Sequence, residues 1–133
     1  MKLRDLIVDT KTVWVPVDGY EDFYVELAYI PRTEMTKMVK DCQRTKMSRA
    51  TRQIETELDQ EKFLATFVER AIKNWKGLTL ETLSDFVPIE YEEENAKNEL
   101  PFDSDNAIFL IKQSQAFDDW VNDKINDIDT FRK

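Results

Sequence analysis

A chain of 133 residues with a formal net charge of −8 is long enough to bury a core without disulfides or metal ions, and its single cysteine cannot form an internal disulfide. Because the sequence contains no histidine, it excludes histidine-based zinc sites, imidazole general bases and Ser-His or Cys-His catalytic pairs. It has only two glycines, neither of them in a phosphate-binding loop, so we expect no enzyme activity, no cofactor and no metal ion.

The first region, residues 1–31, is predicted to form an antiparallel β-hairpin or small sheet. Thr12 to Val17 is rich in β-branched and aromatic residues, and Pro16 favours an edge position. Asp18-Gly19 indicates a turn, and Phe23 to Ile30 alternates between two faces as a second strand does. Such a hairpin is marginally stable alone, so we expect one face to pack on helices.

Residues 32–43 are predicted to form a helix, with Thr33 as its N-cap, because Met35, Met38, Val39 and Cys42 follow at helical spacing. The methionines either fill the core or form a binding surface.

Residues 44–58 have weak periodicity and many small polar and basic side chains, so we interpret them as a mobile basic loop. This loop is either a solvated linker or an electrostatic contact for an acidic partner. Together, the apolar and basic residues of this part of the chain give these candidate partner contacts: Met35, Met38, Lys40, Arg44, Lys46, Arg49 and Arg52.

Residues 59–133 are predicted to form a helical, acidic region. Asp59 should cap a helix from about Gln60 to Lys76, which Gly77 ends in a left-handed conformation. A short helix capped by Thr79 is expected next, followed by an acidic loop that lacks the residue spacing of a calcium site.

The chain should then return to the core at Leu100-Pro101-Phe102. Asp103 or Ser104 should cap a helix that ends near Ser114, and an amphipathic helix is expected from Gln115 to Phe131. The large side chains predicted to be in the core are Trp14, Phe67, Trp75, Phe102, Phe117 and Trp120. The predicted fold class is therefore α+β, with the N-terminal hairpin or small sheet packed on a mainly helical body of four to five helices, in a single domain over residues 1–133.

Charge is spread unevenly along this chain. Residues 1–56 carry ten Lys and Arg against nine Asp and Glu, whereas residues 57–133 carry nine against eighteen. Oppositely charged parts of two copies can attract each other, so we expect a homo-oligomer whose association weakens with salt. No run of about 18 apolar residues is present and the N-terminus is too polar for a signal peptide, so we expect a cytoplasmic protein that does not bind membranes.

Four short motifs in the second half of the chain form a recognisable series: Asn74-Trp75-Lys76-Gly77, Leu100-Pro101-Phe102-Asp103, Asn106-Ala107-Ile108 and Ser114-x-x-Phe117. Each also has a structural explanation, as a helix stop, a return to the core or a cap. In this order, with a small β element before them, they resemble the tail assembly chaperones of long-tailed, lambda-like siphovirus phages.

The resemblance implies a non-enzymatic assembly factor in the cytoplasm of the host cell that is absent from the mature virion. Such chaperones bind the tape-measure protein and keep it soluble while tail-tube subunits polymerise around it. A longer product, made by ribosomal frameshifting, often recruits the major tail tube protein.

The alternative is a small DNA-related protein. In one version the basic residues between Arg32 and Arg52 bind phosphates, and in the other the acidic half mimics DNA and blocks a DNA-binding enzyme. The acidic net charge and the lack of a recognition-helix motif make nucleic-acid binding the weaker expectation.

Overall fold

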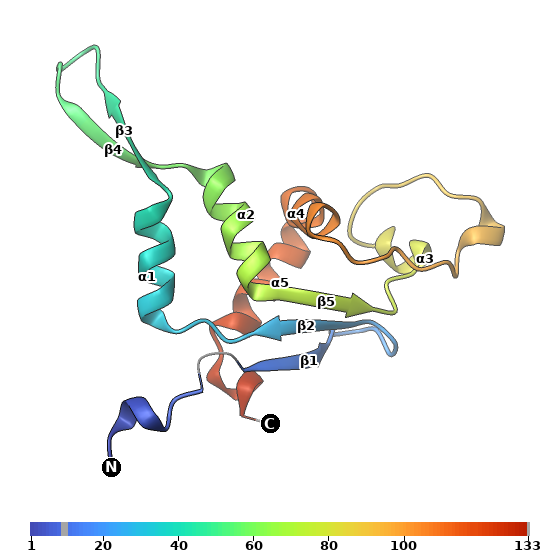
Figure 1. Ribbon diagram of the computed structural model, residues 1–133. Coiled ribbons are helices and arrows are strands. Elements are labelled where there is room, and N and C mark those ends of the chain that lie inside the picture. Colours follow the sequence, from blue (N-terminus) through green and yellow to red (C-terminus); the bar gives the residue numbers. More distant parts are fainter. Residues whose placement is uncertain (9–10, 133) are drawn as a thin grey trace.

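A computed structural model describes residues 1–8 and 11–132 and confirms the α+β class (Figure 1). A sheet lies beside a body of helices, and a second, smaller hairpin projects from one end. In chain order the described elements are η1 (Leu3–Asp5), β1 (Thr12–Pro16), β2 (Tyr24–Ala28), α1 (Arg32–Asp41), β3 (Gln43–Met47), β4 (Ile54–Leu58), α2 (Gln60–Ala71), β5 (Ile72–Lys76), α3 (Leu80–Leu83), η2 (Glu93–Asn95), α4 (Ser104–Gln113), α5 (Gln115–Ile125) and η3 (Ile128–Phe131).

The sheet has the order β1-β2-β5 and is antiparallel throughout. Its N-terminal pair is the predicted hairpin, and β1 is an edge strand as Pro16 requires. Val15, Val25 and Trp75 lie side by side in the register, and all three are buried against the helices. Burial of this face stabilises a hairpin that would be marginal alone.

Trp14 lies on the opposite face of the sheet, so its predicted place in the core is wrong. Its side chain is 40% exposed, and the Lys76 ammonium lies 4.8 Å from the centre of its ring. In a strand, successive residues point to opposite faces, so burial of Val15 leaves Trp14 outside. A cation–π contact takes the place of core packing.

The helix predicted from Gln60 to Lys76 ends at Ala71, and Ile72–Lys76 is strand β5 instead. The prediction failed because Ile72 and Trp75 also suit the helical spacing, whereas the structure uses them to complete the sheet beside β2. Gly77 has the predicted positive φ, 77°, but it follows a strand. A Cβ at this position would lie 1.8 Å from the Asp22 carbonyl oxygen, so the close approach of two chain segments requires glycine here.

The predicted helix caps at Asp59, Thr79 and Asp103 are present, and Ser114 caps α5 in the same way. The side chains of Asp59, Thr79, Asp103 and Ser114 each accept a hydrogen bond from the backbone three residues on. Thr33 is not a cap, because α1 begins at Arg32 directly after Pro31 and has no side-chain cap. The last helix is shorter than predicted: α5 ends at Ile125, and a 3-10 turn continues to Phe131.

The core lies between the sheet and helices α2, α4 and α5. Phe67, Trp75 and Phe117 are buried as predicted, and Phe102 and Trp120 are partly buried against them. The Trp75 indole N–H donates to the Leu100 carbonyl at 2.9 Å, which ties the sheet to the segment entering α4. No helix within the described residues is long and apolar enough to cross a membrane.

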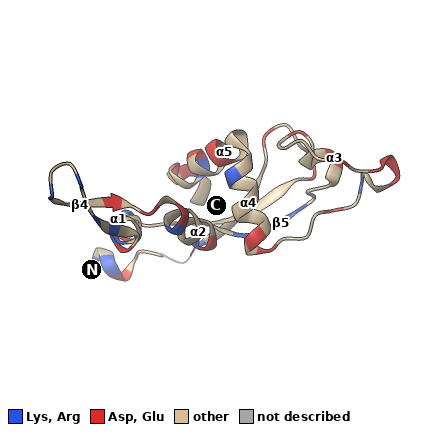
Figure 2. Cartoon of the chain, turned by 90° about the horizontal axis from the view of Figure 1, so that it is seen from above, with Lys and Arg blue, Asp and Glu red and all other residues tan. Residues whose placement is uncertain are grey.

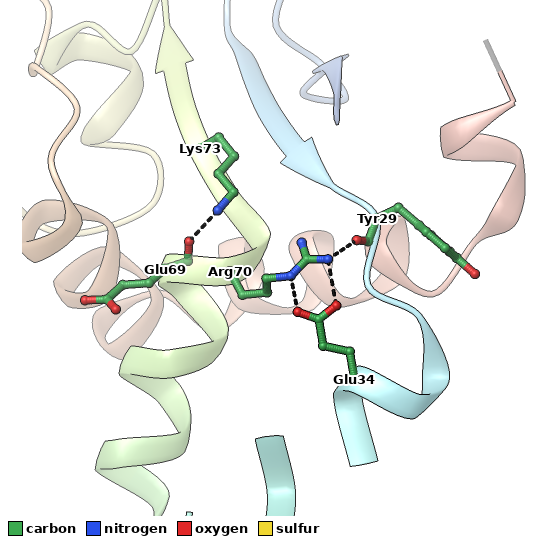
Figure 3. A network of polar contacts seen from close by, with 5 residues as sticks. All are labelled: Tyr29, Glu34, Glu69, Arg70 and Lys73. Atoms are coloured by element: carbon green, nitrogen blue, oxygen red, sulfur yellow. Dashed lines mark hydrogen bonds and ion pairs between the residues drawn. The ribbon is translucent and has the colours of Figure 1, made fainter. Parts of the chain in front are cut away.

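Arg70, near the end of α2, joins α2 to two other segments (Figure 3). Its guanidinium donates to both carboxylate oxygens of Glu34 on α1, at 2.5 and 2.9 Å, and to the Tyr29 carbonyl at 2.7 Å. Bidentate arginine–carboxylate pairing fixes orientation as well as distance. Helix α1, which carries candidate partner contacts, is therefore held in place from the α2 side.

Candidate partner-binding surface

The two candidate methionines of helix α1 differ in how deeply they are buried. Met38 is buried, with 7% of its surface exposed, and its side chain packs in the core. Met35 is half-buried and lines three separate hollows on the surface. Met38 therefore fills the core, whereas Met35 remains a candidate for a binding surface.

One of these hollows contains two phenylalanine side chains, has a volume of about 390 Å³ and lies where α1, α2 and α5 meet; we call it the groove. Phe63 and Phe67 stack in its wall with ring centres 6.2 Å apart. Phe63 is only half-buried, so an apolar ring remains in contact with water. The lining residues are Met35, Leu58, Gln60, Phe63, Leu64, Phe67, Asp118 and Asn122.

Asp118 is the charged residue of the groove. Burial raises the pKa of its carboxyl group, the neighbouring Asp119 raises it further, and a hydrogen bond from Asn122 opposes the shift. Within the described residues no Lys or Arg forms an ion pair with Asp118. The groove therefore combines apolar walls with an uncompensated carboxylate, which suits a ligand that carries both apolar and cationic groups.

The predicted basic loop is wrong: residues 44–58 belong to a hairpin, which we call the arm (Gln43–Leu58). Strands β3 and β4 pair antiparallel, and the arm projects from the ends of α1 and α2 away from the body (Figure 1). Arg44 lies opposite Glu57, with which it forms an ion pair at 2.8 Å, and Lys46 lies opposite Glu55. Opposite charges across the two strands stabilise a hairpin where the sequence predicts a loop.

Charges on the arm are thus partly balanced. It carries four basic and two acidic residues, and the basic pair at its tip, Arg49 and Arg52, is exposed. Figure 2 shows the arm, labelled at β4, at one end of the molecule and α3 with the acidic loop at the other.

The other face of the arm is apolar at its far end. Met47 and Ile54 lie directly opposite each other in the register and are 66% and 73% exposed. Burial of such side chains normally stabilises a protein, so this pair is available for contact with something outside the chain.

The seven candidate residues therefore do not form one site. Met35 and Lys40 line a common hollow on α1. Arg44 and Lys46 are on β3, and Arg49 and Arg52 lie in the turn at the far end of the arm. Two of the basic residues face carboxylates, which removes much of the positive potential that a phosphate-binding patch needs.

Sequence reasoning missed the residues Phe63, Leu64, Asp118, Met47 and Ile54 as possible contacts. The sequence does contain a pattern that predicts the arm. Gln43–Met47 alternates basic with uncharged residues, and Ile54–Leu58 alternates acidic with uncharged ones. Pairing the two charge patterns gives the observed register. The groove had no comparable signal, because it is made by helices distant in sequence.

A second hollow and the single cysteine lie outside the groove. This hollow, of about 570 Å³, lies between the edge strand β1 and the C-terminal residues Lys124, Asp127, Asp129 and Thr130. Within residues 1–8 and 11–132 there is no cluster of three or more metal-ligating side chains. Cys42 is buried, with its Sγ 3.8 Å from the Thr66 hydroxyl oxygen.

Comparison with known proteins gives one family. The model of the YdaY prophage protein family matches residues 31–133, which include α1, the arm and all later elements but not β1 and β2. No curated protein matches the chain. No solved structure matches it either. Because the family match spans well over half of the sequence, the chain belongs to the YdaY prophage protein family and is of phage origin.

Proposed function

We propose that this protein is a non-enzymatic phage tail assembly chaperone that binds the tape-measure protein and keeps it soluble during assembly of the tail tube. Its place of action is the host cytoplasm, and it is not part of the mature virion. Membership of a prophage family agrees with the phage resemblance of its second half. The observation that carries the proposal is the groove between α1, α2 and α5.

The groove has the properties that an amphipathic helical client requires. Such a helix inserts apolar side chains, spaced three and four residues apart, into an apolar recess. Phe63, Leu64 and Met35 supply the recess, and Asp118 can pair with a lysine or arginine beside the apolar stripe of the client. The acidic surface elsewhere on the chain keeps a complex with an aggregation-prone client in solution.

The test is co-expression with the tape-measure protein of the same phage, scoring how much of that client remains soluble and co-purifies. We expect retention with the natural protein and loss with Met35→Lys, which places a charge in the groove. Phe109→Gln is the matched control, because Phe109 is 64% exposed on α4 and does not line the groove. Both variants must show the natural circular dichroism spectrum.

A client that precipitates with the natural protein, and also with any longer frameshift product that recruits the major tail tube protein, would overturn the proposal. The same preparations can be tested for DNA binding in a gel shift at low salt. Binding there, together with failure of the client assay, would favour the DNA-related alternative.

A further inference from the structure

The arm has almost no contact with its own body. Each residue of β3 is exposed, and in β4 only Glu57 and Leu58, next to the body, are partly covered. A two-stranded hairpin is marginally stable by itself in water. The arm is therefore a surface that gains stability by docking elsewhere.

The tip of the arm and the groove are chemically complementary. The tip presents the apolar pair Met47 and Ile54 beside the cations Arg49 and Arg52. The groove presents half-buried apolar side chains around Asp118, whose carboxylate has no cationic partner among the described residues. An apolar pair with adjacent arginines satisfies both requirements of the groove.

Within one molecule the tip lies far from this groove. Leu58, at the base of the arm, lines the groove, and the two strands carry the tip away from it (Figure 1). A strand of five residues spans about 17 Å at about 3.3 Å per residue. Two arms laid side by side in opposite directions would place the tip of each near the base of the other.

We propose that two copies of this chain exchange arms, so that Met47 and Ile54 of each copy dock in the α1–α2–α5 groove of the other. The arrangement is two-fold symmetric and closed, since each copy supplies one tip and one groove. It does not depend on the tape-measure protein being the client, although it uses the groove to which we assign the client.

Charge makes direct edge-to-edge pairing of the strands a weaker explanation. A symmetric β4–β4 pair centred on Thr56 places Glu55 opposite Glu57 of the partner subunit. The corresponding β3–β3 pair centred on Thr45 places Arg44 opposite Lys46 of the partner subunit. Like charges directly opposite each other destabilise a sheet, whereas tip-in-groove docking brings arginine to aspartate.

The first measurement is the mass of the full chain in solution by sedimentation, over a wide range of concentration. We expect a dimer that dissociates on dilution. The double variant Met47→Thr with Ile54→Thr keeps β-forming residues in the arm but removes its apolar contact, and should weaken the dimer by about tenfold or more. Phe109→Gln, which removes an equally exposed side chain from α4, should dimerise normally.

The second measurement tests the ionic contact by charge reversal. Asp118→Arg alone, and Arg49→Glu with Arg52→Glu, should each weaken the dimer. Combining all three substitutions should restore it, because the attraction is re-formed with the signs exchanged. Restoration cannot come from a folding defect.

Three results would overturn the proposal: a natural protein that is monomeric at every concentration, an arm variant that dimerises normally, or loss of the dimer only on Glu92→Gln with Glu93→Gln. The last would assign the partner surface to the acidic loop. These three results concern self-association, whereas client solubility is scored in the separate co-expression assay, so failure of the dimer and failure of the chaperone function can be told apart.

Discussion

At the scale of single residues, the two glycines illustrate how differently the same backbone conformation can constrain a sequence. Gly19 and Gly77 both have positive φ, 90° and 77°. A Cβ at Gly19 would meet nothing within 4 Å, whereas at Gly77 it would overlap the backbone of Asp22. Only Gly77 is therefore required by packing as well as by conformation.

We predict that Gly19→Ala lowers the free energy of unfolding by about 1 to 2 kcal/mol, the usual strain of a left-handed residue. Gly77→Ala should cost about 2 to 5 kcal/mol, because displacement of Asp22 adds a packing term to the same strain. Urea titration followed by circular dichroism measures both. Equal losses for the two variants would mean that the turn at Asp22 moves freely.

Glu34 should make stability depend on pH. Its hydrogen bonds from Arg70 lower the pKa of its carboxyl group, and the charge of Arg70 adds to the effect. A lowered pKa in the folded state adds stability above the ordinary carboxyl pKa, and this is lost as the pH falls through the lowered value.

We expect Glu34→Gln to lower the free energy of unfolding by about 1 kcal/mol at neutral pH, a modest value because the side chain is 38% exposed. The difference from the natural protein should shrink toward zero in acid. Glu21→Gln, in an exposed turn, is the control and should show little effect at either pH. A loss for Glu34→Gln that persists unchanged in acid would contradict the ion-pair explanation.

At the scale of elements, the structure separates what sequence patterns can predict from what they cannot. The N-terminal hairpin and the caps at Asp59, Thr79 and Asp103 depend on local chemistry, and all were predicted. Strand β5 was not, because Ile72 and Trp75 satisfy a helix as well as a strand, and pairing with the distant β2 decides between them. The groove depends on the same kind of distant contact.

The arm should be separable from the body. We predict that replacing Arg44–Glu57 by a two-residue Asn-Gly turn, which joins the paired residues Gln43 and Leu58, changes the free energy of unfolding by no more than about 1 kcal/mol. The same replacement should abolish the dimer, which sedimentation would show. A loss of several kcal/mol would mean that the arm supports the body directly.

At the scale of the whole molecule, charge is divided between two ends. The arm carries a net charge of +2 and the rest of the chain −10, for a total of −8. We predict that raising the salt concentration above about 0.1 M weakens self-association, because exposed charges are then screened beyond about 10 Å. Sedimentation at several salt concentrations measures this, and a dimer strengthened by salt would indicate a contact that is apolar alone.

The hydrogen bond at the base of the arm divides the molecule into two parts, the arm and the body, that differ in local stability. The Asp59 amide donates to the Cys42 carbonyl at 2.7 Å, and this hydrogen bond closes the chain beneath the hairpin. Beyond it the amides of β3 and β4 are protected only by their own ladder, whereas those of β2 lie between two strands over the core. Opening of the arm is therefore a local event that leaves the body folded. In hydrogen exchange, the amide hydrogens of the arm should be replaced by deuterium well before those of β2. Docking of a partner should slow exchange in the arm and so reduce the difference between the two rates.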